Sequence, residues 1–411
     1  MRIRYLSVAL GWTVVAVAAA GSDPKSLAVP PEKLALAKEL VRKLDDDDVD
    51  VREKASADLK AMDRLALPAL VEVMKGTPSN EVSLRVEKLL PGARKKDFDA
   101  RAKVFLADND RKFDHDLLGW SELKKAAGDT PEARMLFADI LTDDECREVL
   151  LSAVSVIRTE QEKFEKRWEV KVKGWRKAGR ELPHQKLKGD EPIHFLAAGW
   201  LGDLLAERDY RCDFRHHVMG VYLTTAEGEL AKAGKGKYGR VFIKLARAWI
   251  EAQTQFYGLR EADTVCREMK FEESLRLRCH ERLVGLGLVG LMSLGELART
   301  GDRKYLPTLT KFFDQDYVQN RDPTGEQKVP EIQTRDMALA FCVELTGQDV
   351  AEYGFSVQWD TKKQPAMKYI SNNYFFRSDK EKTAEQKREA AFKKWAEWEK
   401  ANPLPAVKDK K

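Results

Sequence analysis

The sequence predicts an all-α fold: an α-solenoid-like stack of antiparallel helix hairpins with an irregular helical middle. A helical sequence unit near the N-terminus recurs with substitutions near the C-terminus. Leu67–Leu70 (Leu-Pro-Ala-Leu) is similar to Leu306–Leu309 (Leu-Pro-Thr-Leu). A second similarity keeps the same spacing in both copies, with Arg52, Ala55 and Ala57 in the first and Arg335, Ala338 and Ala340 in the second. Self-similar helix pairs are typical of stacked α-repeats.

The composition agrees with this class. The chain has 411 residues, more than the roughly 250–300 that one compact core supports, which indicates several domains or an elongated stack. Charged residues make up 34% of the chain, above the roughly 25% of an average globular domain, as expected when many amphipathic helices each expose a polar face. The 72 basic residues are interleaved with 67 acidic ones, for a net charge of +5. This balance argues against a nucleic-acid partner.

The first twenty residues have the pattern of a secretion signal. Arg2 and Arg4 precede an apolar stretch from Leu6 to Ala20, which ends in the small residues Ala18–Ala20. This stretch is shorter than the roughly 20 residues of a membrane span. We expect a cleaved signal peptide at residues 1–20, with an uncleaved anchor as the alternative. The protein is then exported to the periplasm or cell envelope, or secreted, with no membrane span after signal removal.

Prolines and capping residues indicate the first helices. Pro30-Pro31 opens one helix, because proline suits the first helical turn, and the acidic run Asp45–Asp48 ends it and favours the start of a second. Pro68 opens a third helix, and Ser79 caps a fourth that we expect to end at Pro91-Gly92. The first two helices have apolar stripes at Leu34, Ala37, Val41 and Leu44, and at Val51, Ala55, Leu59 and Met62. Together they predict two antiparallel hairpins.

Two pieces of the first copy carry a resemblance to a known family. They are Leu67–Leu70 and Asp46–Ala55, where an acidic run continues as Val-Asp-Val-Arg-Glu-Lys-Ala. Both pieces resemble the HEAT repeat, a pair of antiparallel helices. The resemblance is clear over residues 32–91 and 283–348, and between these stretches it rests mainly on helical periodicity.

The HEAT resemblance also implies a ladder of polar bonds. In that family an aspartate and an arginine on successive turns bond along the inner helices, and here Asp46 and Arg52 match those positions. The second copy keeps Arg335, but Val329 stands where the aspartate is expected. The ladder is therefore expected in the first copy and is incomplete in the second.

Further blocks resemble uncharacterised exported proteins of planctomycete bacteria. The blocks are Gly119-Trp120, Gly128-Asp129 with Pro131–Phe137, then Ala340–Phe355, and Lys393–Trp398. This resemblance implies no activity, and it supports only the helical fold and export.

These observations divide the chain into an expected series of segments. The last helix opens at Thr383 with Gln386 in the capping-box position, and it suits a terminal repeat that must hide an apolar face. The expected segments are a signal peptide at 1–20, HEAT-like hairpins at 30–92, a helical region with a charged long helix and loop at 93–192, a central helical region at 193–282, a HEAT-like repeat at 283–352, an aromatic-rich loop at 353–382, the capping helix at 383–400 and a disordered tail at 401–411.

Cys212, His216 and His217 form the one cluster of soft metal ligands. Cys at i and His at i+4 share a helix face, which zinc could exploit. A third such ligand is not evident nearby, so the favoured interpretation is an exposed or capped histidine pair beside a buried cysteine. We therefore predict no metal and no cofactor.

Five cysteines are scattered along the chain without a Cys-x-x-Cys motif. An exported protein can form disulfides, and Cys266 with Cys279 is the nearest pair. The odd number leaves at least one thiol unpaired. Buried cysteines that act as small apolar side chains are the favoured interpretation.

Two segments satisfy the spacing Gly-x-Gly-x-x-Gly, at Gly234–Gly239 and Gly285–Gly290. A dinucleotide site needs a strand immediately before these glycines, and neither segment has one. We expect a turn between helices at the first and a close-packed buried helix at the second.

Aromatic residues are dense between Tyr353 and Phe376, in a segment with little helical periodicity. One interpretation is a loop strapped over the apolar flank of the stack. The alternative is a binding surface, because exposed tryptophan and tyrosine side chains dominate interface energetics. The interaction candidates are Tyr353, Phe355, Trp359, Tyr374 and Phe375.

The sequence favours an exported, non-enzymatic scaffold that binds another protein in the cell envelope. No nucleophile motif, phosphate loop or haem site occurs in the chain. One alternative is a metal-binding or enzymatic module in residues 190–285. Another is a structural protein of the envelope. The identity of the protein partner does not follow from the sequence.

Overall fold

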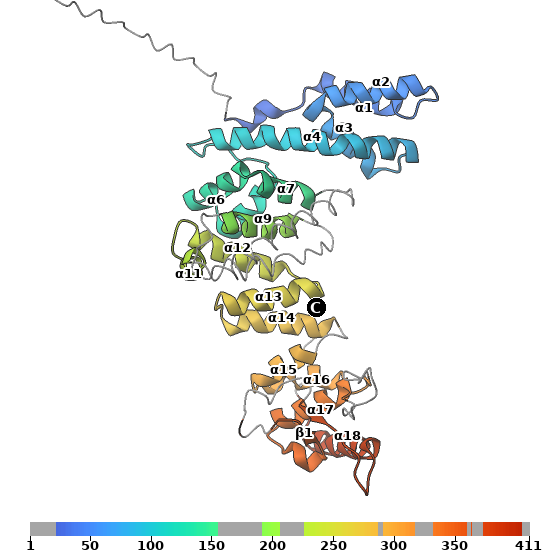
Figure 1. Cartoon of the computed structure of the whole chain (residues 1–411), viewed down its shortest axis with the longest axis vertical. Coiled ribbons are helices and arrows are strands. Elements are labelled where there is room, and N and C mark those ends of the chain that lie inside the picture. The colour runs from blue at the N-terminus through green and yellow to red at the C-terminus, as the bar shows by residue number, and fades with distance from the viewer. Residues whose placement is uncertain are drawn as a thin grey trace, which may run out of the picture. The chain divides into compact units, whose positions relative to one another are not determined.

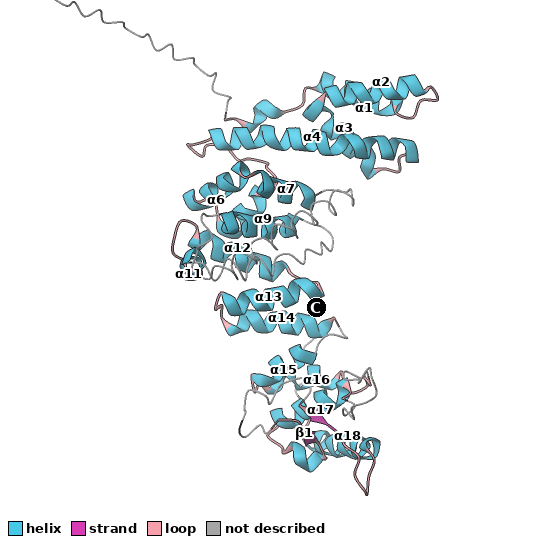
Figure 2. Ribbon diagram, viewed as in Figure 1, coloured by secondary structure: helices cyan, strands magenta, loops and turns pink. Residues whose placement is uncertain are grey.

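The computed structural model of the chain describes residues 22–154, 191–205, 226–286, 291–316, 332–359, 363 and 373–404. Within these ranges the protein is almost entirely helical (Figures 1 and 2), and its strands are a single two-residue pair. The all-α prediction is confirmed. The expected signal peptide and residues 405–411 of the expected tail lie outside the described residues.

The chain forms two compact units, Met1–Leu245 and Ala246–Lys411. Among the described residues, no helix has both the length and the apolar character needed to cross a bilayer. The helices of the first unit are η1 (Pro24–Leu27), α1 (Pro31–Lys43), α2 (Val49–Ala61), η2 (Asp63–Ala66), α3 (Leu67–Lys75), α4 (Asn80–Ala107), α5 (Trp120–Ala127), α6 (Pro131–Thr142), α7 (Asp144–Ala153), α9 (Glu191–Leu205), α11 (Ala226–Lys232) and the first half of α12 (Gly239–Ala252).

The first hairpins begin where the prolines and caps predict. The Asp48 carboxylate accepts from the Asp50 amide at 2.8 Å and caps α2, and the Ser79 hydroxyl accepts from the Val82 amide at 3.3 Å and caps α4. Helix α1 packs on α2, and α3 packs on α4. The apolar sides of these four helices meet in one core. Its fully or nearly fully buried members are Ala37, Leu44, Ala55, Leu59, Leu70, Val86 and Leu90.

The predicted end of the fourth helix is wrong, because α4 continues through Pro91 to Ala107 and is 28 residues long. A proline inside a helix removes one backbone hydrogen bond and costs about 3 kcal/mol. The apolar face continues beyond it, since Ala93, Phe98 and Phe105 are buried. Burial of each large side chain contributes about 1.5–3 kcal/mol, so the continued packing outweighs the proline.

The remainder of the first unit packs around aromatic rings. Phe105, Trp120 and Phe137 meet with ring centroids 5.0–5.5 Å apart. Thr130 caps α6 through the Ala133 amide at 3.1 Å, as predicted. Helix α7 packs on α9, where a Cβ on Gly202 would lie 3.3 Å from the Cβ of Ala153.

The second unit contains the other half of α12, followed by α13 (Phe256–Glu268), α14 (Glu273–Gly285), α15 (Leu291–Arg299), η3 (Arg303–Tyr305), α16 (Leu306–Thr310), α17 (Thr334–Leu345), η4 (Val350–Tyr353), β1 (Ser356–Val357), β2 (Tyr374–Phe375) and α18 (Ala384–Ala401). The two strands are antiparallel, with Ser356 opposite Phe375. Helix α17 is the centre of this unit, because α15, α16, α18 and β2 all pack on it. Each side chain from Met337 to Val343 is fully buried.

Helix α18 closes one side of this core, as the sequence predicts. Thr383 and Gln386 form the capping box, with the Gln386 amide donating to the Thr383 hydroxyl at 3.2 Å. Ala391 and Trp395 are buried against the core, and Phe392 and Trp398 are partly buried.

The first glycine motif forms a turn, and the described part of the second lies at a helix end. Gly234 and Gly236 have φ of 67° and 79° in the turn between α11 and α12, and a Cβ on Gly239 would lie 2.7 Å from the Gly234 carbonyl carbon. The predicted turn is confirmed. The close-packed buried helix predicted for Gly285–Gly290 is wrong at its first residue, because Gly285 is the exposed last residue of α14 and a Cβ there would meet nothing within 4 Å. Gly287 and Gly290 lie outside the described residues.

One buried ion pair joins α18 to α17. Arg388 donates from Nε and Nη2 to the two carboxylate oxygens of Asp336 at 2.7 and 2.9 Å. The side chains are 4% and 0% exposed. A bidentate pair of this kind fixes the orientation of the last helix on the core.

We predict that Arg388→Met lowers the free energy of unfolding by about 3–5 kcal/mol, because it leaves the Asp336 carboxylate buried without its partner. Denaturant unfolding followed by circular dichroism measures this change. Lys393→Met on the exposed face of the same helix is the control, and it should change stability by no more than about 0.5 kcal/mol. Equal effects of the two substitutions would contradict the assigned role.

Candidate functional site

The weak metal-ligand candidates Cys212, His216 and His217 lie outside the described residues. Within the described ranges, no group of three or more His, Cys, Asp or Glu side chains is arranged to hold a metal ion. The other four cysteines are buried and carry free thiols, which agrees with the favoured interpretation of them as apolar side chains.

The predicted ladder residues make different bonds from those implied by the HEAT resemblance. Arg52 donates to the main-chain carbonyls of Asp46 and Asp47, at 2.6 and 3.0 Å, rather than to the Asp46 carboxylate. That carboxylate instead accepts from the Asp48 amide at 3.0 Å, ahead of α2. Arg335 donates to Gln333 at 2.6 Å and contacts Glu385 at 3.3 Å. Arg52 therefore stabilises the turn before α2, and Arg335 stabilises the start of α17.

The aromatic interaction candidates are largely inside the second unit. Tyr353, Phe355, Tyr374 and Phe375 are at most 7% exposed and belong to the core around α17, whereas Trp359 is half-buried. Tyr374 donates from its hydroxyl to Glu344 at 3.0 Å. These contacts favour the interpretation of the segment as a strap over the apolar flank.

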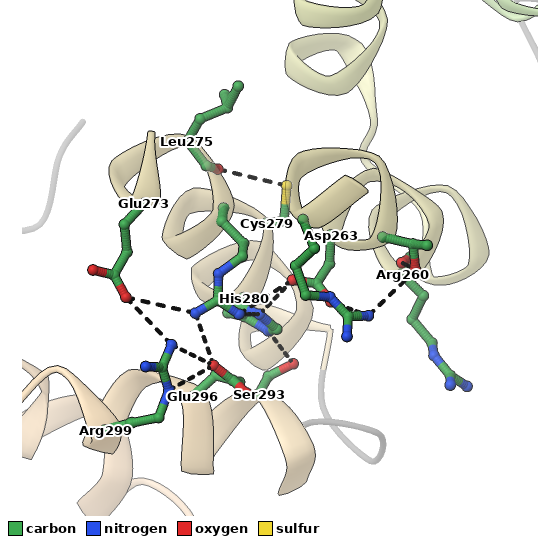
Figure 3. Close-up of polar contacts among 12 residues, drawn as sticks. Arg260, Asp263, Glu273, Leu275, Cys279, His280, Ser293, Glu296 and Arg299 are labelled. Atoms are coloured by element: carbon green, nitrogen blue, oxygen red, sulfur yellow. Dashed lines mark hydrogen bonds and ion pairs between the residues drawn. The ribbon is translucent and has the colours of Figure 1, made fainter. Parts of the chain in front are cut away.

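A buried relay of polar side chains links α13, α14 and α15, and sequence reasoning missed it (Figure 3). His280 lies between Asp263 and Ser293, with its Nε2 2.9 Å from the Asp263 carboxylate and its Nδ1 3.1 Å from the Ser293 hydroxyl. A carboxylate can only accept, so His280 donates from Nε2 to Asp263, and its Nδ1 contacts the Ser293 hydroxyl. These three residue types in this order resemble the relay that activates a serine nucleophile.

Charged side chains surround this relay. Arg276 lies 3.4 Å from Asp263 and 2.8 Å from Glu296, so it bridges α14 and α15. Burial alone would raise the pKa of the Asp263 carboxyl, but the hydrogen bond from His280 and the nearby positive charges bring that pKa below its ordinary value. Asp263 therefore stays ionised and holds the His280 ring in one orientation.

The relay is closed to a substrate. Ser293 is 3% exposed and His280 is 4% exposed. A nucleophile needs space beside it for the reacting atom, and the burial of Ser293 leaves none. The arrangement therefore fastens three consecutive helices to one another.

A second site is a pocket of about 410 Å³ in the first unit. The walls come from the start of α3, from α4, from the loop before α5 with the first turn of α5, and from the ends of α7 and α9. Its apolar lining includes Leu67, Phe98, Leu117, Leu151 and Leu205. Its volume lies in the range of ligand pockets, roughly 300–1,000 Å³.

Charged side chains line the same pocket. Arg101 is occupied, because it donates to Asp97 at 2.6 Å and lies 3.7 Å from the Asp116 carboxylate. Arg94 donates to the main-chain carbonyl of Val154, at the end of α7, at 2.7 Å. Burial lowers the pKa of the Arg94 guanidinium below its ordinary value. Sequence reasoning missed this pocket because its walls come from five separate parts of the chain.

A buried network fixes the loop that supplies one wall. Asp108 accepts from the Lys112 and Phe113 amides at 2.9 and 3.2 Å, lies 2.9 Å from His115 and accepts from Arg134 at 3.2 Å. Burial alone would raise the pKa of Asp108, but these hydrogen bonds lower it to about 2. The network thus holds the chain between α4 and α5, which carries Asp116, Leu117 and Leu118 to the pocket.

Comparisons with protein-family models, with curated proteins and with solved structures find no match to this chain.

We predict that the stability of the first unit depends on Asp108 in acid. Its folded-state pKa is about 2 against an ordinary value of 3.8. The carboxylate stabilises the fold above the ordinary value, and this contribution is lost as the pH falls from about 4 towards 2. Asp108→Asn should lose about 2 kcal/mol at pH 7 and should weaken this acid dependence. Urea unfolding at a series of pH values measures both effects.

The control for this experiment is Asp110→Asn. Asp110 pairs with Lys112 at 2.7 Å but is 69% exposed, so its removal should have little effect. If Asp110→Asn and Asp108→Asn lose the same stability at pH 7, the buried network does not hold this loop.

Proposed function

We propose that this chain is an exported, non-enzymatic scaffold of the helical-repeat type that binds another protein in the cell envelope. The observation that carries the proposal is the packing order of the helices. Within the first unit α1 packs on α2 and α3 on α4, and within the second α13 packs on α14 and α14 on α15. Helices that pack chiefly on their neighbours in sequence are what a stack of α-repeats requires.

The local structure of the two sequence copies supports a repeat. Leu67–Leu70 opens α3 directly after the 3-10 turn η2, and Leu306–Leu309 opens α16 directly after the 3-10 turn η3. In each copy a proline occupies the first helical turn. The HEAT-like, α-solenoid interpretation and the export signal both belong to this proposal.

The closed relay supports a non-enzymatic role. The polar cluster with the best arrangement for nucleophilic catalysis, among the residues that the structure describes, has its serine buried at 3% exposure. The alternatives are a metal-binding or enzymatic module in residues 190–285 and a structural envelope protein. Metal analysis of purified protein, and of a Cys212→Ser variant, distinguishes the first of these, and self-association distinguishes the second.

A binding experiment tests the scaffold proposal. Purified protein immobilised on beads should enrich a specific protein from envelope extract, and the purified pair should form a complex of defined stoichiometry by isothermal titration calorimetry. Beads carrying the heat-unfolded chain are the control. Failure to enrich any protein beyond this control would contradict the proposal.

A labelling experiment tests the non-enzymatic role. We predict that a fluorophosphonate probe leaves Ser293 unmodified in the folded protein, because the hydroxyl is buried and bonded to His280. Intact-mass spectrometry measures the labelling. Stoichiometric modification of Ser293 that disappears in His280→Gln would show an active nucleophile and would reverse this part of the proposal.

A further inference from the structure

We propose that the pocket around Arg94 binds a single carboxylate group carried on an apolar body. This inference deepens the proposed function, on which it rests, by naming the chemistry that the scaffold recognises. Two kinds of ligand carry a carboxylate on an apolar body: the C-terminal residue of a partner polypeptide, and a free aliphatic acid.

The first step is the state of the Arg94 guanidinium. Of its five N–H donors, one is used on the Val154 carbonyl at 2.7 Å. Within the described residues Arg94 has no carboxylate partner, and its remaining nitrogens are not among the buried groups that lack a partner. Solvent therefore reaches a cation that is fixed at one end and has unused donors.

Arg94 and Arg101 are the two cations that line the pocket. Arg101 is taken by Asp97 and Asp116, so these two carboxylates are already neutralised in part and do not reach Arg94. The planar guanidinium of Arg94 matches a carboxylate, which it can bind through two parallel hydrogen bonds. Arg94 is therefore the pocket's free recognition group for an anion.

The third step concerns the charge of the ligand. Glu122 also lines the pocket, and it makes no ion pair in the described structure. Its negative charge repels any anion, and it repels a dianion about twice as strongly as a monoanion. The attraction to Arg94 also doubles for a dianion, so these two charges do not select by charge alone, and the match is made by one planar guanidinium with one carboxylate.

The fourth step sets the body of the ligand. The walls beside Arg94 include Phe98, Leu117 and Leu151, and the pocket holds about 410 Å³. Removing apolar surface from water favours binding, so a ligand with an apolar side chain gains most here. The site thus fits an apolar residue that carries its own carboxylate.

Titration of the full-length protein with three probes tests the proposal. The probes are an acetylated pentapeptide that ends in leucine with a free carboxylate, the same peptide with a C-terminal amide, and hexanoate. Isothermal titration calorimetry should detect the free-carboxylate peptide or hexanoate and should not detect the amide. Binding of the peptide alone assigns the site to polypeptide termini, and binding of hexanoate assigns it to free acids.

Two variants and a control make the result specific. Arg94→Gln should weaken binding by about 10–100-fold, because a hydrogen-bonded charge is worth about 1.5–3 kcal/mol. Ser121→Phe should block binding by filling the pocket while Arg94 stays in place, since Ser121 is an exposed small residue of its lining. Lys95→Gln removes the same charge from the exposed neighbouring position of α4 and should leave binding unchanged.

Three results would overturn the inference: no binding of either carboxylate probe, equal binding of the amide, or equal loss in Lys95→Gln and Arg94→Gln. Equal affinity for inorganic phosphate would overturn the match of the site to a carboxylate. If an envelope protein is captured as proposed above while Arg94→Gln retains full capture and no probe binds, only this inference fails. If no partner is captured but hexanoate binds through Arg94, the scaffold proposal fails instead.

Discussion

The structure depends on the burial of apolar side chains of each helix against the helices packed on it. Most helices here have 7–15 residues, a length at which an isolated helix is marginal in water. Helix α16 has five residues and is held by Leu306 and Leu309, both nearly fully buried. Helix α17 is surrounded by other elements and has no exposed face of its own. Tertiary packing therefore supplies the stability that the separate helices lack.

Polar contacts then set the geometry that apolar packing leaves free. Apolar stripes can slide on one another, whereas the Asp336–Arg388 pair, the Asp263–His280–Ser293 relay and the Asp108 network each require one arrangement. The Asp108 network has a further consequence, because the loop it holds forms a wall of the Arg94 pocket. A network with a structural role in the first unit thus positions Asp116, Leu117 and Leu118 in the wall of the pocket.

Local signals made much of the fold predictable. The helix starts at Pro31, Pro68 and Pro131 and the capping box at Thr383 depend on residues within one turn of each other, so a single sequence shows them. The continuation of α4 through Pro91 was missed because it depends on burial of Phe98 and Phe105 by distant segments.

The candidate sites were less predictable for the same physical reason. Asp263, His280 and Ser293 meet only when three helices take a particular register, and no spacing in the sequence sets that register. The HEAT resemblance placed Arg52 in a structural ladder with Asp46, but the hydrogen bonds of Arg52 go to main-chain carbonyls and not to the expected carboxylate.

Native-state hydrogen exchange in mild denaturant tests the central claim most directly. Helices that depend on their sequence neighbours should lose amide protection in contiguous blocks, with α1 to α4 opening together at a free energy different from that of α15 to α18. Exchange of all these helices at one common free energy of opening would contradict the account, because it would show a single cooperative core in place of neighbour-on-neighbour packing.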